Sequence, residues 1–550
     1  MRTIGQLGPR LRRWRTVAAL GAAVAALPIA STAVTGAAVR HQQEDPAVVR
    51  TDHGNVRGTV TETYREFQGI PYAAAPVGVR RWRSPEPAPA WSGIRDATTP
   101  KPGCAQLEGL PMDEASVTDD CLYLNVTTPR NSSGQRLPVV VWLHGGHFLF
   151  GQGDTYGGQR LAIGGEVVVV TLNYRLGPLG FLAHPALEGA QGVDTSGNYG
   201  LEDQQAALRW VRANAAAFGG DSGNVTIAGQ SAGATSVCAH LSAPGSGGLF
   251  HRAIMQSNGC VLPFRTRQEA RESSAAFVTA AGCDNDPAGV ESCLRGRSAR
   301  QLVEAAAYPG QTAWGAEPVA GGPVLPVDPA EAVATGRFHR VPVLIGATRD
   351  EYRAQVWGME RTGMLCAPGE EAPCPLTEDQ YLGMVEATFA GDAATVLARY
   401  PRTRYGSATE ALSAIMTDFE YARPIFDSAL AFSRHVPTYM YEFADRDAPF
   451  YAEPATPSFP TGAYHTAELP YLFTVDYSHP LSAGQERLAQ TMVASWSRFA
   501  HAGDPDGVGL PDWPRFDGRS PYVQALVPDA IGRTDFTVEH QVALWRSLPS

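Results

Sequence analysis

The 550-residue chain almost lacks lysine: Lys101 is the only one, and arginine supplies the rest of its 44 basic residues. We interpret this as a coding preference with no functional meaning. The chain also lacks a basic cluster after residue 40, and its formal net charge is −11. Proteins that bind nucleic acids need clustered positive charge opposite the phosphates. The composition therefore argues against a nucleic-acid partner.

Two further absences narrow the function classes. No C-x-x-C pair occurs, which argues against a zinc site. After residue 30, no apolar run approaches the ~20 residues that a membrane-spanning helix needs, so no stable membrane span is expected. With 44% hydrophobic and 18% charged residues, the chain has ample material for a large folded core.

The first 38 residues contain no Asp or Glu. Five arginines fall within the first 15 positions, residues 16–30 are apolar, and small residues follow. This order is typical of a secretion signal over residues 1–38, and we predict cleavage near Ala33 or Ala38. The alternative is a retained membrane anchor, for which the apolar run is short. Cleavage removes five positive charges and gives a secreted, extracellular protein.

Eight cysteines agree with export to an oxidising compartment. Spacing alone does not settle their pairing, because eight cysteines allow about 105 combinations. Three local pairs are plausible: Cys104 with Cys121, Cys283 with Cys293, and Cys366 with Cys374. Cys238 and Cys260 either pair with each other or stay as buried free thiols.

Strand-like and helix-like segments alternate along the chain. A hairpin is predicted over residues 48–60. Apolar, β-branched runs predict strands at residues 122–127, 139–143, 167–172, 225–228, 253–256, 342–346 and 437–443. Helical patterns occupy residues 198–217 and 488–502. The alternation argues for a large, mostly parallel, twisted sheet covered by helices. We interpret residues 263–340 and 353–436 as helical insertions, not as separate domains.

The residues GQSAG at positions 229–233 have the G-x-S-x-G form of a nucleophile elbow. A predicted strand precedes them and a predicted helix follows, as this motif requires. Such a turn presents Ser231 at a helix N-terminus, where N–H groups favour developing negative charge. Glycines two residues before and after the serine remove Cβ atoms that would collide. For five residues alone, an ordinary strand–helix turn is the alternative.

The flanking residues make the motif specific. The run FGGDSGNVTIAGQSAG at residues 218–233 resembles the serine signature of the type-B carboxylesterase family, which is related to the cholinesterases. DDCLYLN at residues 119–125 resembles a second family signature. The resemblance covers residues 46–545 as a single domain. It implies an α/β-hydrolase fold, a small-molecule ester substrate, and no metal or cofactor. The pairs Cys104–Cys121 and Cys283–Cys293 also resemble disulfides of the family.

In α/β-hydrolases the serine is followed along the chain by an acid and then a histidine. Glu351 follows the predicted strand at residues 342–346, at the carboxyl end where α/β sites assemble. The residues alone do not separate Glu351 from its neighbour Asp350. The resemblance favours Glu351, although Tyr352 stands where the family's D-E-G motif has glycine.

His465 is the predicted base. It begins the run HTAELPYLF, which resembles the family's histidine loop. Glu468 in the same run is expected to support the loop. Its proximity also makes it a second candidate for the carboxylate that orients His465, but chain order and the family pattern favour Glu351.

The run HGGHF at residues 144–148 follows a predicted strand and resembles the family's oxyanion loop. The resemblance implies that the backbone N–H groups of Gly146, His147 and Ala232 bind the oxyanion, with Gly145 in support. His147 replaces a small residue, so its side chain is expected to narrow the pocket while its backbone donor remains.

These residues predict a secreted serine carboxylesterase that works through an acyl-enzyme. The alternatives are a lipase on longer acyl esters and a non-catalytic adhesion or binding relative. Choline esters are disfavoured for two reasons. Residues 105–120 contain no aromatic side chain for a quaternary ammonium, and Gln230 replaces an acidic residue common in the family. The sequence leaves the natural ester and the oligomeric state open.

Overall fold

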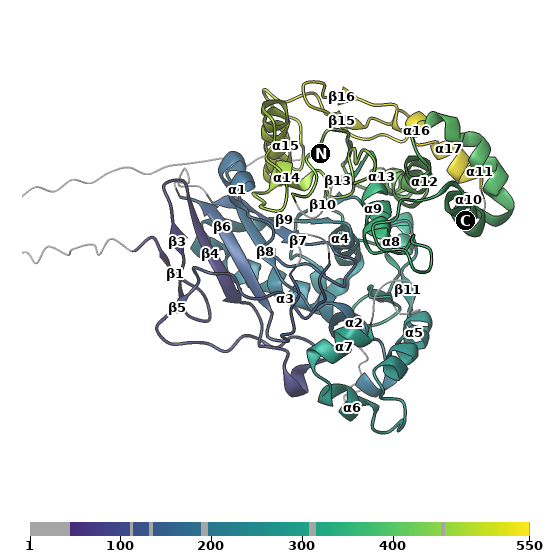
Figure 1. The fold of residues 1–550 in the computed structure, drawn as a ribbon. Helices are drawn as coiled ribbons and strands as arrows, with labels where there is room; N and C mark the ends of the chain where they lie inside the picture. Colours follow the sequence, from purple (N-terminus) through teal and green to yellow (C-terminus); the bar gives the residue numbers. More distant parts are fainter. Residues whose placement is uncertain are drawn as a thin grey trace, which may run out of the picture. The chain divides into compact units, whose positions relative to one another are not determined.

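The computed structural model is built around a mixed 11-stranded β-sheet (Figure 1). The structure describes residues 45–109, 114–130, 136–188, 196–306, 315–452 and 457–548. They belong to one compact unit, Asp45–Ser550. The predicted secretion signal, residues 1–38, lies outside the described residues.

The sheet has a parallel centre and antiparallel ends. In spatial order its strands are β16 (Gly532–Arg533), β15 (Gln524–Leu526), β14 (Thr438–Phe443), β13 (Val343–Thr348), β10 (Arg252–Gln256), β9 (Gly220–Gln230), β7 (Leu137–Leu143), β8 (Val168–Leu172), β6 (Tyr123–Pro129), β4 (Tyr64–Pro71) and β3 (Thr59–Val60). The strands from β15 to β8 run parallel, whereas β16, β6, β4 and β3 pair antiparallel. The parallel strands direct their carboxyl ends to one edge, where ligand sites of α/β sheets form.

Small sheets and helices complete the fold. The short strands are β1 (Val48–Arg50), β2 (Asn55–Arg57), β5 (Ile94–Asp96), β11 (Arg265–Thr266) and β12 (Val319–Ala320). The helices of the first half are α1 (Gln159–Gly165), α2 (Gly177–Phe181), α3 (Tyr199–Asn214), α4 (Ala232–Ser242), α5 (Arg267–Ala280), α6 (Val290–Gly296) and α7 (Ala299–Ala305). Those of the second half are α8 (Pro329–Thr335), α9 (Arg353–Arg361), α10 (Glu378–Phe389), α11 (Ala393–Arg399), α12 (Ala408–Met416), α13 (Arg423–Ser433), α14 (Leu469–Leu472), α15 (Ala483–Ala502), α16 (Phe536–Glu539) and α17 (Val542–Ser547).

Each face of the sheet has its own hydrophobic core. Val139, Val141 and Leu143 of β7 pack into the larger core, which includes buried residues of α3, α4 and α13. Val140 and Trp142, which point to the opposite face, pack into a second core with α15. This alternation follows from the two-residue period of a strand. Burial on both faces explains why the sequence of β7 is one continuous apolar run.

The helical insertions form two groups (Figure 1). Helices α5, α6 and α7 gather in one place, and α10, α11, α12 and α17 gather in another. The second group has its own buried cluster, which includes Tyr381, Leu412 and Trp545. The prediction of helical insertions is therefore confirmed, with the two-residue strands β11 and β12 as the exception in the first.

The predicted N-terminal hairpin forms between β1 and β2. The strand predictions correspond to β6, β7, β8, β9, β10, β13 and β14, and the helix predictions to α3 and α15. The sequence patterns did not predict β4, β5, β11, β12, β15 and β16. The last two are too short to show a periodic pattern.

Four disulfides join the eight cysteines. Cys104–Cys121, Cys283–Cys293 and Cys366–Cys374 are the three plausible local pairs. The fourth joins Cys238 of α4 to Cys260, which follows β10. Of the two states that the sequence left open for Cys238 and Cys260, the structure has the disulfide.

A buried ion pair ties the sheet to α3. Arg175 follows β8, and its Nε and Nη2 atoms each lie 2.7 Å from an oxygen of Asp203 in α3. The backbone N–H of Arg175 donates to the same carboxylate at 3.1 Å. Both side chains are almost fully buried. Such a bidentate pair holds its geometry firmly, and loss of one partner leaves an uncompensated charge in the core.

Replacing Asp203 by alanine is therefore expected to lower the free energy of unfolding by about 3–5 kcal/mol. The matched control is Asp529→Ala, which breaks an exposed pair with Arg487 and should cost less than about 1 kcal/mol. Guanidinium unfolding of both variants and the parent protein measures the difference. Equal losses in the two variants would contradict a structural role for the buried pair.

Candidate active site

The turn between β9 and α4 has strained backbone geometry at Ser231, with φ 56° and ψ −122°. Two close approaches require glycine on either side. A Cβ atom at Gly229 would lie 2.4 Å from the carbonyl carbon of Gly233, and one at Gly233 would lie 1.9 Å from the oxygen of Leu143. A non-glycine residue in this region of backbone space is uncommon and marks functional sites. The strand–turn–helix geometry that a nucleophile elbow requires is therefore present around Ser231.

Glu351 and His465 meet beside this turn. Glu351 lies just after β13 and is fully buried. His465 Nδ1 and Glu351 Oε2 are 2.5 Å apart. The other carboxylate oxygen accepts the backbone N–H of Thr348 at 2.8 Å, and the N–H of His465 donates to the Glu351 carbonyl at 3.2 Å. These contacts hold Nδ1 towards the carboxylate and leave Nε2 to face the opposite way.

Gln230 lies against that second nitrogen. Its Nε2 atom is 3.1 Å from His465 Nε2, so the amide donates to a neutral imidazole whose Nδ1 carries the proton. The backbone N–H of Ser231 donates to the carbonyl of Gln256 at 2.8 Å, which joins the elbow to β10. The imidazole thus lies over the elbow and contacts the residue just before the serine.

Glu468 lies behind the site and contacts other groups. Its Oε1 accepts from Gln256 Nε2 at 2.9 Å, and Gln256 Oε1 accepts from Trp496 Nε1 at 3.0 Å. Burial raises the pKa of Glu468 to about 7, and the charge of Glu351 adds to the rise. Of the two carboxylates that the sequence proposed as partners of His465, only Glu351 is bonded to it among the described contacts.

The loop after β7 reaches the elbow. A Cβ atom at Gly145 would lie 3.2 Å from Ser231 Cβ and 2.8 Å from the backbone oxygen of Gln230. Glycine at position 145 therefore permits this close approach. Gly146 and His147 both have positive φ. Within the described part of the chain, the N–H groups of Gly146, His147 and Ala232 donate to no protein acceptor. These unused donors, beside a serine, are what an oxyanion hole needs.

His147 is an exposed residue of this loop. Crowding of its ring by the surrounding protein lowers the pKa of His147, and the nearby His465 adds to the effect. Its ring lies 6.1 Å from that of Phe150 in an edge arrangement. The side chain therefore adds bulk and a hydrogen-bonding ring to this loop, without adding charge near neutral pH.

Two neighbours of the site were not found from sequence. Gln256 ends β10 next to the elbow, and that strand-end position was the only available signal. Tyr421 comes from a π-helical turn, η7 (Thr417–Ala422), and its ring lies 5.3 Å from that of His465. π-helical turns are frequent at functional sites, but nothing in the local sequence indicates one here.

The fold has solved counterparts. A Geobacillus stearothermophilus carboxylesterase superposes with a TM-score of 0.74 at 33% identity, over 90% of this chain and 99% of that one. A p-nitrobenzyl esterase superposes with a TM-score of 0.72 at 33% identity, over 90% of this chain and all of the other. The α/β-hydrolase fold expected from the sequence is thereby confirmed, and the protein is a carboxylic ester hydrolase.

The chain belongs to the carboxylesterase family, whose sequence model matches residues 45–545. Among curated proteins, the human cocaine esterase is 33% identical over 92% of this chain and 93% of its own length. The para-nitrobenzyl esterase of Bacillus subtilis (strain 168) is 35% identical over 85% of this chain and 92% of its own. The family resemblance noted in the sequence is therefore confirmed.

The raised pKa of Glu468 gives a testable pH dependence. The pKa of a glutamate in the unfolded chain is ~4.3, below the value of about 7 in the folded protein. The folded protein therefore disfavours ionisation of Glu468, and its free energy of unfolding falls as pH rises from ~4.3 towards 7. The Glu468→Gln variant has no carboxyl group at this position and does not lose stability in this way. Between pH 5 and 7, we expect the free energy of unfolding of the parent to fall relative to the variant by about 2 kcal/mol. Guanidinium unfolding at several pH values measures it; parallel curves would contradict the assignment.

Proposed function

We propose that this carboxylesterase is a secreted enzyme that hydrolyses short-to-medium acyl esters through a Ser231–His465–Glu351 triad. The observation that carries the proposal is the 2.5 Å contact between His465 and Glu351 next to a strained serine turn. The three residues come from three separate segments, in the chain order serine, acid, histidine that α/β-hydrolases use.

In the first half-reaction, Ser231 Oγ attacks the ester carbonyl and His465 Nε2 takes its proton. Glu351 accepts the Nδ1–H bond throughout and stabilises the imidazolium. The N–H groups of Gly146, His147 and Ala232 bind the negative oxygen of the tetrahedral intermediate. The imidazolium then protonates the departing alcohol, which leaves an acyl-serine.

In the second half-reaction, a water molecule gives its proton to His465 and attacks the acyl carbon. The oxyanion forms again in the same N–H pocket. Collapse of the intermediate breaks the bond to Ser231, and His465 returns its proton to the serine oxygen. Before attack, the imidazole must exchange its contact with Gln230 for one with Ser231. Until then the amide of Gln230 contacts the Nε2 atom that takes the proton.

Export is supported by the four disulfides and by the signal-like first 38 residues. In the described residues, no helix combines the length and apolarity needed to cross a membrane. A broad ester specificity is supported by the relatives, since cocaine esterase and para-nitrobenzyl esterase are named for unlike substrates.

The direct test is hydrolysis of a p-nitrophenyl ester series from acetate to palmitate. Ser231→Ala should lower kcat/KM by roughly 10⁴- to 10⁶-fold, whereas the control Ser222→Ala, on the same strand, should stay near the parent value. Full activity in Ser231→Ala would overturn the triad. A maximum at the longest chains with a rate jump on micelles would favour the lipase alternative, and inactivity of the parent would favour a binding relative.

A second prediction separates the two buried carboxylates. Glu351→Gln should lower kcat by about 10⁴-fold, because the amide donates to Nδ1 and fixes the wrong tautomer. Glu468→Gln, a matched change in the adjacent carboxylate, should keep kcat within about tenfold, the scale of an indirect effect. Steady-state kinetics on p-nitrophenyl acetate gives both values. The reverse ranking would assign the orienting role to Glu468.

A further inference from the structure

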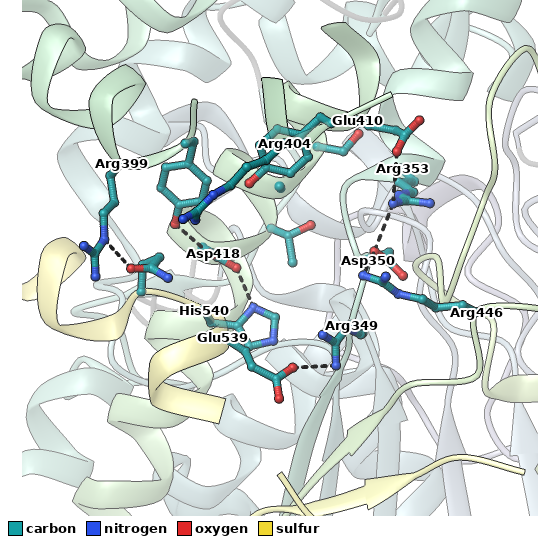
Figure 2. Close-up of a pocket in the computed structure, with 16 residues that line it drawn as sticks. Arg349, Asp350, Arg353, Arg399, Arg404, Glu410, Asp418, Arg446, Glu539 and His540 are labelled. Atoms are coloured by element: carbon teal, nitrogen blue, oxygen red, sulfur yellow. Dashed lines mark hydrogen bonds and ion pairs between the residues drawn. The ribbon is translucent and has the colours of Figure 1, made fainter. Parts of the chain in front are cut away.

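A strongly charged pocket lies outside the ester site (Figure 2). Its volume is about 280 Å³. It is lined by the segment after β13, the residues from α11 to the π-helical turn η7, and the end of α16. Ser231, His465 and Glu351 do not line it. The proposed ester mechanism makes no use of this space.

The pocket is basic although the whole chain is acidic. Five of its lining residues are arginines: Arg349, Arg353, Arg399, Arg404 and Arg446. The lining also has four carboxylates and one histidine: Asp350, Glu410, Asp418, Glu539 and His540. The histidine is held charged by contacts that include the buried Glu442, and with Glu442 counted the cations outnumber the anions by about one. In a protein with a formal charge of −11, such a local excess indicates a site for anions.

The charge of the histidine follows from its contacts. His540 Nδ1 lies 2.5 Å from Asp418, and Nε2 lies 2.6 Å from the buried carboxylate of Glu442. Burial by itself lowers the pKa of His540, but the two carboxylates outweigh it and raise that pKa to about 10. Asp418 also accepts from Tyr400 Oη at 2.6 Å. One wall of the pocket is therefore a fixed, fully bonded network.

The arginines keep donors for a ligand. Figure 2 shows Arg404 and Arg446 reaching into the pocket from different sides. Arg404 has no side-chain partner among the described residues. Among the described residues, Arg446 has only a 3.4 Å contact to Asp350. This contact is longer than a good charge-assisted hydrogen bond, so the guanidinium group of Arg446 can also bind a second acceptor. Arg353 lies 3.3 Å from the same carboxylate and also donates to the Pro460 carbonyl at 2.5 Å.

We propose that this pocket binds a small oxyanion with more than one negative charge, of the phosphate or dicarboxylate class, with Arg404 and Arg446 as its main ligands. Guanidinium groups match such anions because two parallel N–H bonds reach two oxygens of one group. The pocket is large enough for such an anion. Its excess positive charge offsets the repulsion between the anion and the carboxylates that line the pocket.

Calorimetric titration of the full protein tests the site. Sodium phosphate is the first probe and sodium succinate the second, with ionic strength held constant by sodium chloride. The variants are Arg404→Ala and Arg404→Lys, with Arg434→Ala as the control. Arg434 is also exposed and unpaired among the described residues, but it does not line the pocket. Hydrolysis of p-nitrophenyl acetate checks that each variant is folded.

We expect saturable binding of one anion per chain. Arg404→Ala should weaken it about tenfold or more, Arg404→Lys should weaken it less, and Arg434→Ala should change it less than about twofold. Binding of phosphate alone, or of succinate alone, would support the site and identify the class of anion. No saturable binding of either probe, or equal losses in Arg404→Ala and Arg434→Ala, would overturn the proposal.

Discussion

The site depends on how closely the start of α4 approaches the end of β7. With a Cβ atom at Gly233 only 1.9 Å from the Leu143 oxygen, only glycine fits there. The same closeness brings the loop that leaves β7 against Ser231. A Cβ atom at Gly145 would lie only 3.2 Å from the Cβ atom of Ser231. One steric requirement thus strains the backbone at Ser231 and places the unused N–H groups next to this residue. The strain, ~1–3 kcal/mol, is sustained because the surrounding parallel strands are buried on both faces.

The two carboxylates near His465 differ because their partners differ. Glu351 accepts a backbone N–H and the histidine, so its negative charge is compensated. Glu468 accepts from the neutral amide of Gln256 and from its own backbone N–H, and its Oε2 atom has no partner among the described residues. Two adjacent buried charges of the same sign are costly, and the pKa of Glu468 is raised accordingly. This asymmetry gives an electrostatic reason for the acid that chain order favoured.

The parts of the site that could be predicted are those that depend on short, continuous segments of the sequence. The strand, turn and helix around Ser231, the loop at residues 144–148, and Glu351 at a strand end all follow from local patterns and a known resemblance. The contact of Gln230 with His465, the position of Tyr421 and the Cys238–Cys260 disulfide depend on segments far apart in sequence. Local sequence propensities do not encode contacts between segments that are distant in the chain. The same holds for the short strands at the sheet edge, where β15 pairs with β14 and β16 pairs with β15.

The ester site and the basic pocket share one segment of chain. Glu351 faces His465, while its neighbour Asp350 lines the basic pocket and accepts the backbone N–H of Ala463 at 3.1 Å. Asp350 therefore holds the segment that carries His465, and it is itself contacted by Arg353 and Arg446. An anion bound by these arginines competes with Asp350 for them. Occupancy of the basic pocket and the position of the histidine segment are then thermodynamically linked, and the linkage acts equally in both directions.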